Sequence, residues 1–413
     1  MKVAIIGAGA AGMMAAATIN ELSPETEVIL VEKNDALGKK VIISGGGRCN
    51  VTTGFENVKF VLENYPRGNK FLISAIHRFP PLSVRAWFED HDVPLKCEKD
   101  MRVFPVSNSG LDIVEVFKKI FKDNATKILF NHAATKIEKI DKGFLVYFKD
   151  DTSILVDKVV LALGGQAYRM TGSTGDGYTL AEALGHTITK LVPSLHSFMS
   201  LEKWPRALAG MSFLKATITA DYIKPNTKTG PFLFTHSGIS GPAVFAVSSL
   251  VAMRQFSPGN PLKIYIDFLP DQTQDELIKN LQTTAKEFPK KIFKSTLHHF
   301  VPANLCDALC KEYFVPGDKK NGDISKADLA MTAALLKKVT INAIGRGAGD
   351  EFVTAGGVEL SEVDPKTMES KKSPGLFLAG EILNIDGFTG GFNLQASWAT
   401  GRAAGEYIAS QEL

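Results

Sequence analysis

Three glycines near the N-terminus are the residues of this 413-residue chain whose spacing points most directly to chemistry. Gly7, Gly9 and Gly12 follow a short apolar run, and a second apolar run ends in Glu32. This order is the fingerprint of a dinucleotide-binding strand–helix–strand unit. The first glycine permits a tight turn, the second lets a pyrophosphate approach the backbone, and the third lets the helix pack on the strand. Glu32 stands where a carboxylate can accept hydrogen bonds from an adenosine ribose.

The helix of this unit is predicted over residues 13–22, which are rich in Ala, Met and Leu. Its free backbone N–H groups, with Ala10 and Ala11 at the start, and its partial positive charge would face the phosphates. A signal peptide is the competing interpretation, because Lys2 precedes an Ala-rich apolar segment. Three glycines would weaken an apolar signal helix, and a second strand follows directly, so the dinucleotide site is favoured.

A second glycine-rich stretch follows, with the sequence Ser-Gly-Gly-Gly-Arg-Cys-Asn from Ser44 to Asn50. Its glycines allow close backbone approach, and Arg48 can offer a charged fork to a phosphate or a carboxylate. We predict a second cofactor loop here; a surface turn with a solvated Arg48 is the alternative. The candidate contacts from this part of the chain are Lys33, Lys40, Ser44, Gly45, Gly46, Arg48, Cys49 and Asn50.

The four cysteines stand at positions 49, 97, 306 and 310. They are too scattered for a disulfide framework and are typical of reduced thiols in a cytoplasmic protein. Cys49 could be a redox partner of a flavin, but that chemistry usually needs a second nearby cysteine, so packing is favoured. Cys306 and Cys310 share one predicted helix face. Buried thiols are favoured there over a metal pair, and no metal is predicted.

Two later apolar runs, residues 158–163 and 375–379, are predicted to be buried strands that end in glycine. In a doubly wound sheet the ligand lies beyond the carboxyl ends of the strands, so both ends are expected to meet the cofactor. Glu381 could reach a ribityl chain or the backbone near the pyrophosphate. The candidate contacts here are Gly164, Gly165, Gly380 and Glu381.

A last helix is predicted over residues 395–410, directly after a glycine-rich turn. Its positive end would stabilise the negative charge that a reduced flavin carries on its ring. The candidate contacts of this turn are Gly390, Gly391, Phe392 and Asn393.

Between these cofactor segments the character of the chain changes. The sequence predicts a discontinuous cofactor-binding domain over residues 1–192 and 339–413, a β-rich part over 193–270 and a helical part over 271–338. His236 with Ser237 and Ser240 invites a nucleophile–base interpretation, but no acid partner and no nucleophile elbow accompany these residues. A glycine-rich turn that faces the flavin is favoured, and His236 and Arg48 are the candidates for catalytic contacts.

Gly345, Gly347 and Gly349 imitate a second nucleotide fingerprint. A strand pattern follows them where a phosphate-capping helix is required, so we predict no separate NAD(P)H domain. The isolated His77, His91 and His132 lack metal-ligand spacing.

The composition bounds the partners. Apolar residues make up 45% of the chain and charged residues 22%, with 47 basic and 44 acidic side chains and a net charge of +3. This composition is ordinary for a soluble globular protein, and the net charge is too small to argue for nucleic acid or membrane binding. No apolar run is long enough to span a bilayer.

The chain as a whole resembles bacterial FAD-dependent oxidoreductases known as BaiN/RdsA-type NAD(P)/FAD-dependent oxidoreductases, conserved flavoproteins or aminoacetone oxidase-like enzymes. The resemblance implies FAD and an α/β fold: a Rossmann-like domain of glutathione-reductase and fumarate-reductase type, interrupted by an insert with a β-barrel-like part and a helical part. Thr53 and Asn384 depart from it, since the family often has Asn and Asp there. The motifs that carry it lie at residues 7–12, 44–50, 163–165, 172–177, 234–242, 354–358, 367–370 and 379–401.

The expected function is an FAD-dependent oxidoreductase that acts on a small molecule by hydride transfer through flavin N5. NAD(P)H is a candidate donor that would visit the flavin transiently. An RNA-modifying or RNA-binding flavoprotein and a flavin sensor without turnover are the alternatives. The near-neutral charge argues against nucleic acid. The sequence leaves the substrate and the oligomeric state open.

Overall fold

The computed structural model describes residues 1–347 and 352–411. The chain divides into two compact units. Met1–Ser194 with Phe352–Leu413 form the first, and Leu195–Glu351 form the second. Each unit is described by itself.

A five-stranded parallel sheet forms the centre of the first unit. The apolar runs predicted as strands supply four of its members, and their side chains are almost completely buried. Burial on both faces is typical of parallel strands covered by helices. The strand order is β19 (Leu376–Leu378), β10 (Lys158–Leu161), β1 (Lys2–Ile6), β2 (Glu27–Val31) and β6 (Lys127–Leu129).

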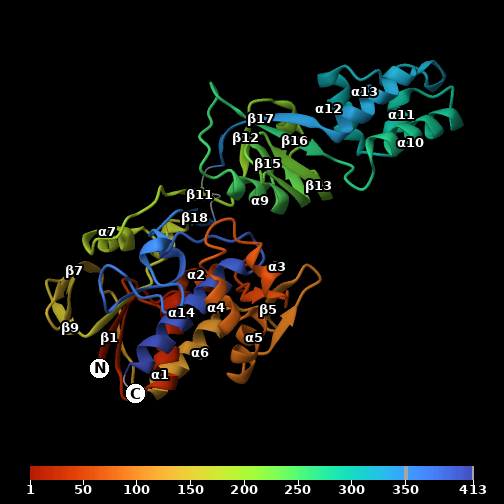
Figure 1. The fold of residues 1–413 in the computed structure, drawn as a ribbon. Coiled ribbons are helices and arrows are strands. Elements are labelled where there is room, and N and C mark those ends of the chain that lie inside the picture. Colours follow the sequence, from red (N-terminus) through yellow and green to blue (C-terminus); the bar gives the residue numbers. More distant parts are fainter. Residues whose placement is uncertain (348–351, 412–413) are drawn as a thin grey trace. The chain divides into compact units, whose positions relative to one another are not determined.

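Helices α1 (Ala10–Leu22) and α14 (Phe392–Ser410) pack against each other beside this sheet, although they lie at opposite ends of the sequence (Figure 1). Small residues permit this close approach. A Cβ atom added at Gly401 would lie 2.3 Å from the backbone oxygen of Ala11. The pairing brings the N-terminal and C-terminal cofactor segments of the sequence together.

Smaller elements complete the first unit. Strands β7 (Ala134–Ile140), β8 (Gly143–Phe148) and β9 (Ser153–Val156) form an antiparallel meander. Two further small sheets join β3 (Thr52–Thr53), β5 (Arg102–Pro105) and β4 (Leu95–Cys97), and β11 (Val192–Ser194) with β18 (Val353–Ala355). The remaining helices are α2 (Lys39–Ile43), α3 (Val58–Leu62), α4 (Ile73–Arg78), α5 (Pro81–Asp90), α6 (Gly110–Asp123) and α7 (Asp176–Ala183).

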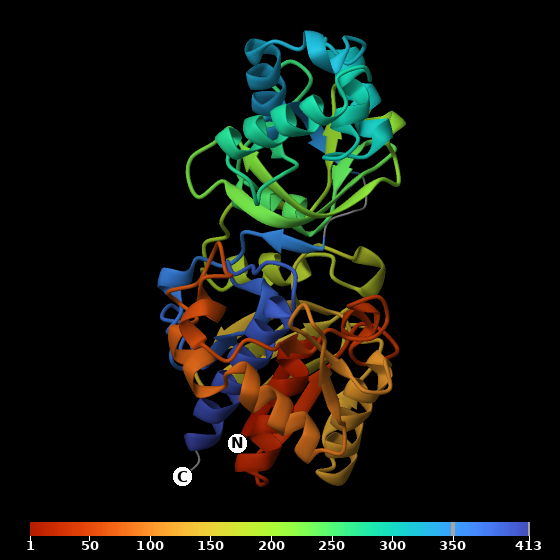
Figure 2. The ribbon, with the colours of Figure 1, turned by 90° about the vertical axis from the view of Figure 1, so that its right-hand side faces the viewer.

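The second unit contains a closed six-stranded barrel and a group of helices (Figure 2). Their apolar side chains form one continuous core. The barrel order is β12 (Phe198–Ser200), β15 (Gly238–Ser240), β14 (Thr227–Phe234), β13 (Ser212–Ala220), β16 (Leu262–Asp267) and β17 (Val339–Arg346). The helices are α8 (Trp204–Ala207), α9 (Pro242–Leu250), α10 (Gln274–Glu287), α11 (Phe293–Leu297), α12 (Ala303–Tyr313) and α13 (Lys326–Lys337).

Strand β17 differs from the domain boundary expected at residue 339. It pairs with β12 and β16, and it lies in the second unit. The physical reason is its alternation, because Val339, Ile341 and Ala343 are fully buried in the core of that unit. The imitated fingerprint begins inside this strand at Gly345, and its last two residues, 348 and 349, lie outside the described residues. Among the described residues, no helix is long and apolar enough to cross a membrane.

Candidate cofactor site

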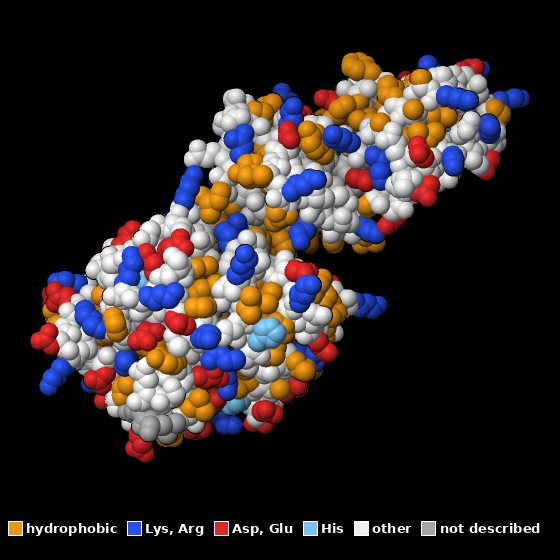
Figure 3. All heavy atoms as spheres, in the orientation of Figure 1, with side chains coloured by type: hydrophobic (Ala, Val, Ile, Leu, Met, Phe, Trp, Pro, Cys, Tyr) orange, Lys and Arg blue, Asp and Glu red, His pale blue; other side chains and the backbone are white. Residues whose placement is uncertain are grey.

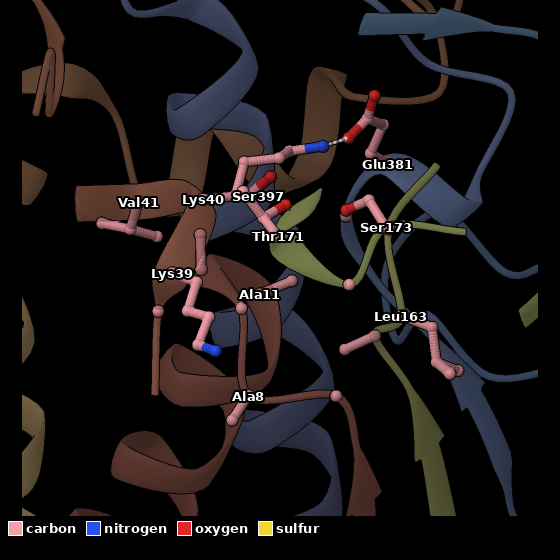
Figure 4. Close-up of a pocket in the computed structure, with 18 of the residues that line it drawn as sticks. Ala8, Ala11, Lys39, Lys40, Val41, Leu163, Thr171, Ser173, Glu381 and Ser397 are labelled. Atoms are coloured by element: carbon pink, nitrogen blue, oxygen red, sulfur yellow. Dashed lines mark hydrogen bonds and ion pairs between the residues drawn. The ribbon is translucent and has the colours of Figure 1, made fainter. Parts of the chain in front are cut away.

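A cavity of about 620 Å³ opens in the first unit at the carboxyl ends of the parallel strands. Residues 6–11 after β1, 31–34 after β2, 162–164 after β10 and 379–381 after β19 all line it. Figure 4 shows Ala8, Leu163 and Glu381, which come from three of these segments, around the cavity. This is the edge at which doubly wound sheets bind their ligands.

The first glycine turn shows a distinct reason for each glycine. Gly7 has φ of +103°, and an added Cβ atom would lie 2.6 Å from the backbone oxygen of Ala162. A Cβ atom at Gly12 would lie 1.9 Å from the backbone oxygen of Gly7, so this glycine allows helix α1 to approach the strand. A Cβ atom at Gly9 would meet no atom within 4 Å. Gly9 lines the cavity, so its missing side chain leaves room for a ligand.

Helix α1 begins at this open position. Its N-cap residue Gly9 provides no side-chain hydrogen bond, and Ala10 and Ala11 in the first turn line the cavity. The first backbone N–H groups of an α-helix have no partner inside the helix. The cavity therefore contains a site that favours a phosphate by hydrogen bonding and by the helix dipole.

Glu32 lines the cavity, but its carboxylate also holds the glycine turn. Its Oε2 accepts a hydrogen bond from the backbone N–H of Ala8 at 3.0 Å. Its Oε1 accepts from the backbone N–H of Asn34 at 2.9 Å and from the side-chain amide of Asn34 at 2.7 Å. Glu32 is only 8% exposed, so these hydrogen bonds are shielded from solvent.

Two ion pairs border the cavity. Lys40 Nζ pairs with Glu381 Oε2, as Figure 4 shows, while Glu381 Oε1 accepts a hydrogen bond from the backbone N–H of Thr354 at 3.0 Å. Lys33 Nζ pairs with Asp176 Oδ2 at 2.7 Å. Partial burial opposes ionisation of Asp176, but the hydrogen bonds from Lys33 and Thr174 hold its pKa below the usual value.

The second glycine stretch contributes only its first half to the lining, through Ser44, Gly45 and Gly46. Arg48 is not among the lining residues. Its Nη1 lies 2.7 Å from Glu98 Oε1, and its guanidinium lies 3.7 Å from the centre of the Phe104 ring.

The last two residues of that stretch also point into protein. Cys49 is fully buried, and this burial raises the pKa of its thiol to about 12. Asn50 Oδ1 accepts a hydrogen bond from the backbone N–H of Val103 at 3.2 Å.

The C-terminal turn places Asn393 at the cavity, held by hydrogen bonds between its side chain and both backbone groups of Gly387 at 2.9 and 2.8 Å. Helix α14 begins at Phe392, three residues before the predicted start, with Gly391 as its N-cap. The other predicted contacts outside the lining are Gly12, Gly165, Gly390, Gly391 and Phe392.

His236 lies in the second unit, exposed in the loop between β14 and β15, and does not line this cavity. Of the two departures from the resembled family, neither Thr53 nor Asn384 lines it. Asn384 Oδ1 is buried and makes no hydrogen bond with the described residues.

Several further residues line the cavity but were not predicted from the sequence: Asn34, Arg102, His132, Tyr168, Thr171, Ser173, Phe352 and Ser397. Ser173 and Ser397 lie within motifs of the family resemblance, but neither was singled out there as a cofactor contact. His132 was not predicted because it stands alone in the sequence, without a motif around it. Its Nδ1 lies 2.7 Å from the backbone oxygen of Phe130. Its position just after the end of strand β6 could have placed His132 at the cavity, but β6 itself was not predicted.

These residues fit FAD. The uncapped start of α1 and the open space at Gly9 suit a pyrophosphate. The hydroxyl groups of Thr171, Ser173 and Ser397 and the Lys40–Glu381 pair offer donors and acceptors to a polyol chain (Figure 4).

Comparison with known proteins gives a family match over nearly the whole chain. The model of the HI0933-like protein Rossmann domain matches residues 1–407. A 3-dehydro-bile acid delta(4,6)-reductase of Clostridium scindens is 29% identical over 416 residues, with 99% of each chain covered. A ribosomal RNA dihydrouridine synthase of Haemophilus influenzae is also 29% identical over 416 residues, with 98% of each chain covered. The resemblance inferred from the motifs is confirmed.

Solved structures share the fold. A flavocytochrome c3 fumarate reductase aligns with a TM-score of 0.51 at 18% identity, covering 100% of this chain and 78% of that one. A 3-ketosteroid-delta4-(5alpha)-dehydrogenase of Rhodococcus jostii RHA1 aligns with a TM-score of 0.51 at 14% identity, covering 98% and 96%. The Rossmann-like fold of fumarate-reductase type is confirmed, and a six-stranded barrel is present.

Proposed function

The chain belongs to the HI0933-like family of FAD-binding oxidoreductases, and from this premise we propose that it reduces a carbon–carbon double bond conjugated with a carbonyl group in a small molecule. One observation carries the proposal. Two full-length relatives at equal identity bear names with one reaction in common, since a delta(4,6)-reductase and a dihydrouridine synthase both add hydrogen across a ring double bond.

Bound FAD would supply the hydride, through N5 of its flavin ring. The chain's own residues bind and orient it. The start of α1 and the space at Gly9 would receive the pyrophosphate. Glu381, fixed by Lys40 and by the backbone of Thr354, presents a carboxylate that cannot swing freely.

Helix α14 contributes electrostatics. Its N-cap residue, Gly391, has no side chain that could accept hydrogen bonds from the first turn. Asn393 and Ser397 from the first turns of the helix line the cavity. The positive end of this 19-residue helix favours negative charge nearby. Such a field favours a cofactor that gains electrons during turnover.

NAD(P)H is the proposed electron donor. The sequence contains one complete dinucleotide fingerprint, at residues 7–12, and FAD would occupy it. The nicotinamide would therefore bind transiently and leave before the substrate enters. This order predicts ping-pong kinetics for the donor and the acceptor.

The proposal is tested by anaerobic mixing of the purified holoprotein with NADH and NADPH. We expect one of them to bleach the flavin absorbance, and a cyclic conjugated enone to restore it without oxygen. Cyclohexanone, which lacks the double bond, is the matched control. Failure of both donors, or reoxidation by oxygen but not by any enone, contradicts the reductase proposal.

An RNA substrate is the second candidate function, and one observation favours it. Lys and Arg outnumber Asp and Glu over residues 195–347, although the whole chain is nearly neutral. Lys and Arg side chains are spread over the face of the second unit in Figure 3. If a ribosomal RNA fragment reoxidises the reduced flavin and gains two hydrogens per modified uridine while enones do not, this candidate replaces the first.

A further inference from the structure

Two cysteines of the second unit form a close pair on one helix. Cys306 and Cys310 lie one turn apart on α12, and their Sγ atoms are 3.9 Å apart. Cys306 is 1% exposed, whereas Cys310 is half-buried. A small reagent can therefore reach the Cys310 thiol, whereas the Cys306 thiol beside it is shielded from solvent.

The surroundings distinguish the two sulfurs. The two thiols share a hydrogen bond in which either sulfur can donate, and this contact lowers the pKa of Cys310 and raises that of Cys306. The Lys294 ammonium group also lowers the pKa of Cys310, while the Asp307 carboxylate, which lies 2.6 Å from Lys294 Nζ through Oδ1, opposes that shift. A thiolate beside a cation is the reactive form of cysteine.

The pair is packed closely by its neighbours. Cys306 Sγ lies 3.9 Å from the backbone oxygen of Lys294. A Cβ atom added at Gly317 would lie 2.8 Å from Cys310 Sγ. No group of three metal-ligating side chains exists among residues 1–347 and 352–411, so a metal centre is not supported.

We propose that Cys306 and Cys310 are a reversible redox site that hydrogen peroxide converts to an intrahelical disulfide. The Cys310 thiolate attacks one oxygen of the peroxide, the O–O bond breaks, and the hydroxide released takes up a proton. Cys310 is then a sulfenic acid. The Cys306 sulfur attacks Cys310 Sγ, the S–O bond breaks, and its own proton leaves with the hydroxide as water. Two thiols and one peroxide give one disulfide and two waters.

Helix geometry makes this disulfide reducible. Residues four apart on a helix have Cβ atoms about 5–6 Å apart, whereas a disulfide needs about 3.5–4.5 Å. Closing the bond must therefore tighten one turn of α12. Strained disulfides have more oxidising potentials and belong to the labile, regulatory class.

The test uses the full-length holoprotein and a few equivalents of hydrogen peroxide. Cys306 and Cys310 both lie in the tryptic peptide 295–311, so the disulfide appears as the loss of two hydrogens from that peptide. We expect this species to form about tenfold faster than Cys97 is oxidised and to disappear with dithiothreitol. Cys97 is the internal control, because it is exposed but has no thiol partner among the described residues.

Two variants sharpen the test. Cys306→Ser removes the resolving thiol, so we expect sulfenic acid to accumulate at residue 310 and to be trapped by dimedone. Cys310→Ser removes the attacking thiol, so Cys306 should stay reduced. The proposal is overturned if wild-type protein oxidises at Cys97 while peptide 295–311 stays fully alkylatable, or if Cys306→Ser gives no trapped sulfenic acid.

Discussion

The two glycine-rich loops of the first unit are similar in sequence, but they differ in which of their residues face the cavity and which contact the protein. In the loop from Gly7 to Gly12, the outer glycines are demanded by the protein itself and Gly9 opens onto the cavity. In the loop from Ser44 to Asn50, the first residues line the cavity and the last three are held by protein partners.

A glycine cluster in a sequence therefore indicates a close approach to the backbone, but it does not identify the group that approaches. At Gly12 the neighbour is the chain's own backbone, and at Gly9 it is open space. Added Cβ positions separate the two cases, which gives variants with opposite expected effects on folding and on FAD binding.

Gly12→Val should have the largest effect. The first side-chain atom would lie 1.9 Å from a backbone oxygen, so helix α1 must move from the strand. We expect a loss of about 3 kcal/mol in stability, as for severe overpacking, together with loss of FAD. Thermal unfolding of the apoprotein measures it. An unchanged midpoint contradicts the packing role of Gly12.

Arg48→Ala should have a smaller effect on stability and almost none on FAD. Its guanidinium pairs with Glu98 and stacks on Phe104 at a half-buried position, worth about 1 kcal/mol. FAD affinity should stay within about twofold, whereas Lys40→Met, which frees the cavity carboxylate Glu381, should weaken it more. Titration of both apoproteins with FAD measures this. The reverse order would restore Arg48 as a cofactor contact.

Cys49 should be inert in the native protein. Its pKa is raised to about 12, so at pH 8 iodoacetamide should modify exposed Cys97 and leave Cys49 untouched. The unfolded thiol ionises near pH 9.0, so the stability Cys49 contributes is complete below that pH and declines as pH rises toward 12. The difference in melting midpoint between wild type and Cys49→Ala should therefore shrink between pH 8 and 11. Ready alkylation of native Cys49 would support the redox alternative.

The parts of the fold that local patterns encode were predictable. Four apolar runs became four parallel strands, because short continuous apolar runs carry the signal of buried strands. The edge strand β6, residues Lys127–Leu129, was missed because three residues show no periodicity. Strand β17 was assigned to the wrong side of the domain boundary, because pairing partners are not written in a strand's own sequence.

The candidate cofactor site was predictable to a similar extent. Backbone contributions at Gly7, Gly9 and Gly380 follow from spacing alone, and all three line the cavity. Side-chain partners did not follow. Lys40 and Glu381 are 341 positions apart, and Arg48 and Glu98 are 50 apart. Such pairs depend on the assembled fold, which a single sequence read locally does not contain.

Binding of FAD to Gly9→Val apoprotein is the most direct test of whether this cavity holds FAD. Gly9 has an extended backbone that Val can adopt, and its added side chain meets only the cavity. We expect an unchanged apoprotein melting midpoint and at least about a 100-fold loss of FAD affinity, or ~3 kcal/mol. Gly259→Val, at a second open glycine away from the cavity lining, is the control and should bind FAD normally. Wild-type FAD affinity in Gly9→Val would contradict the assignment of this cavity to FAD.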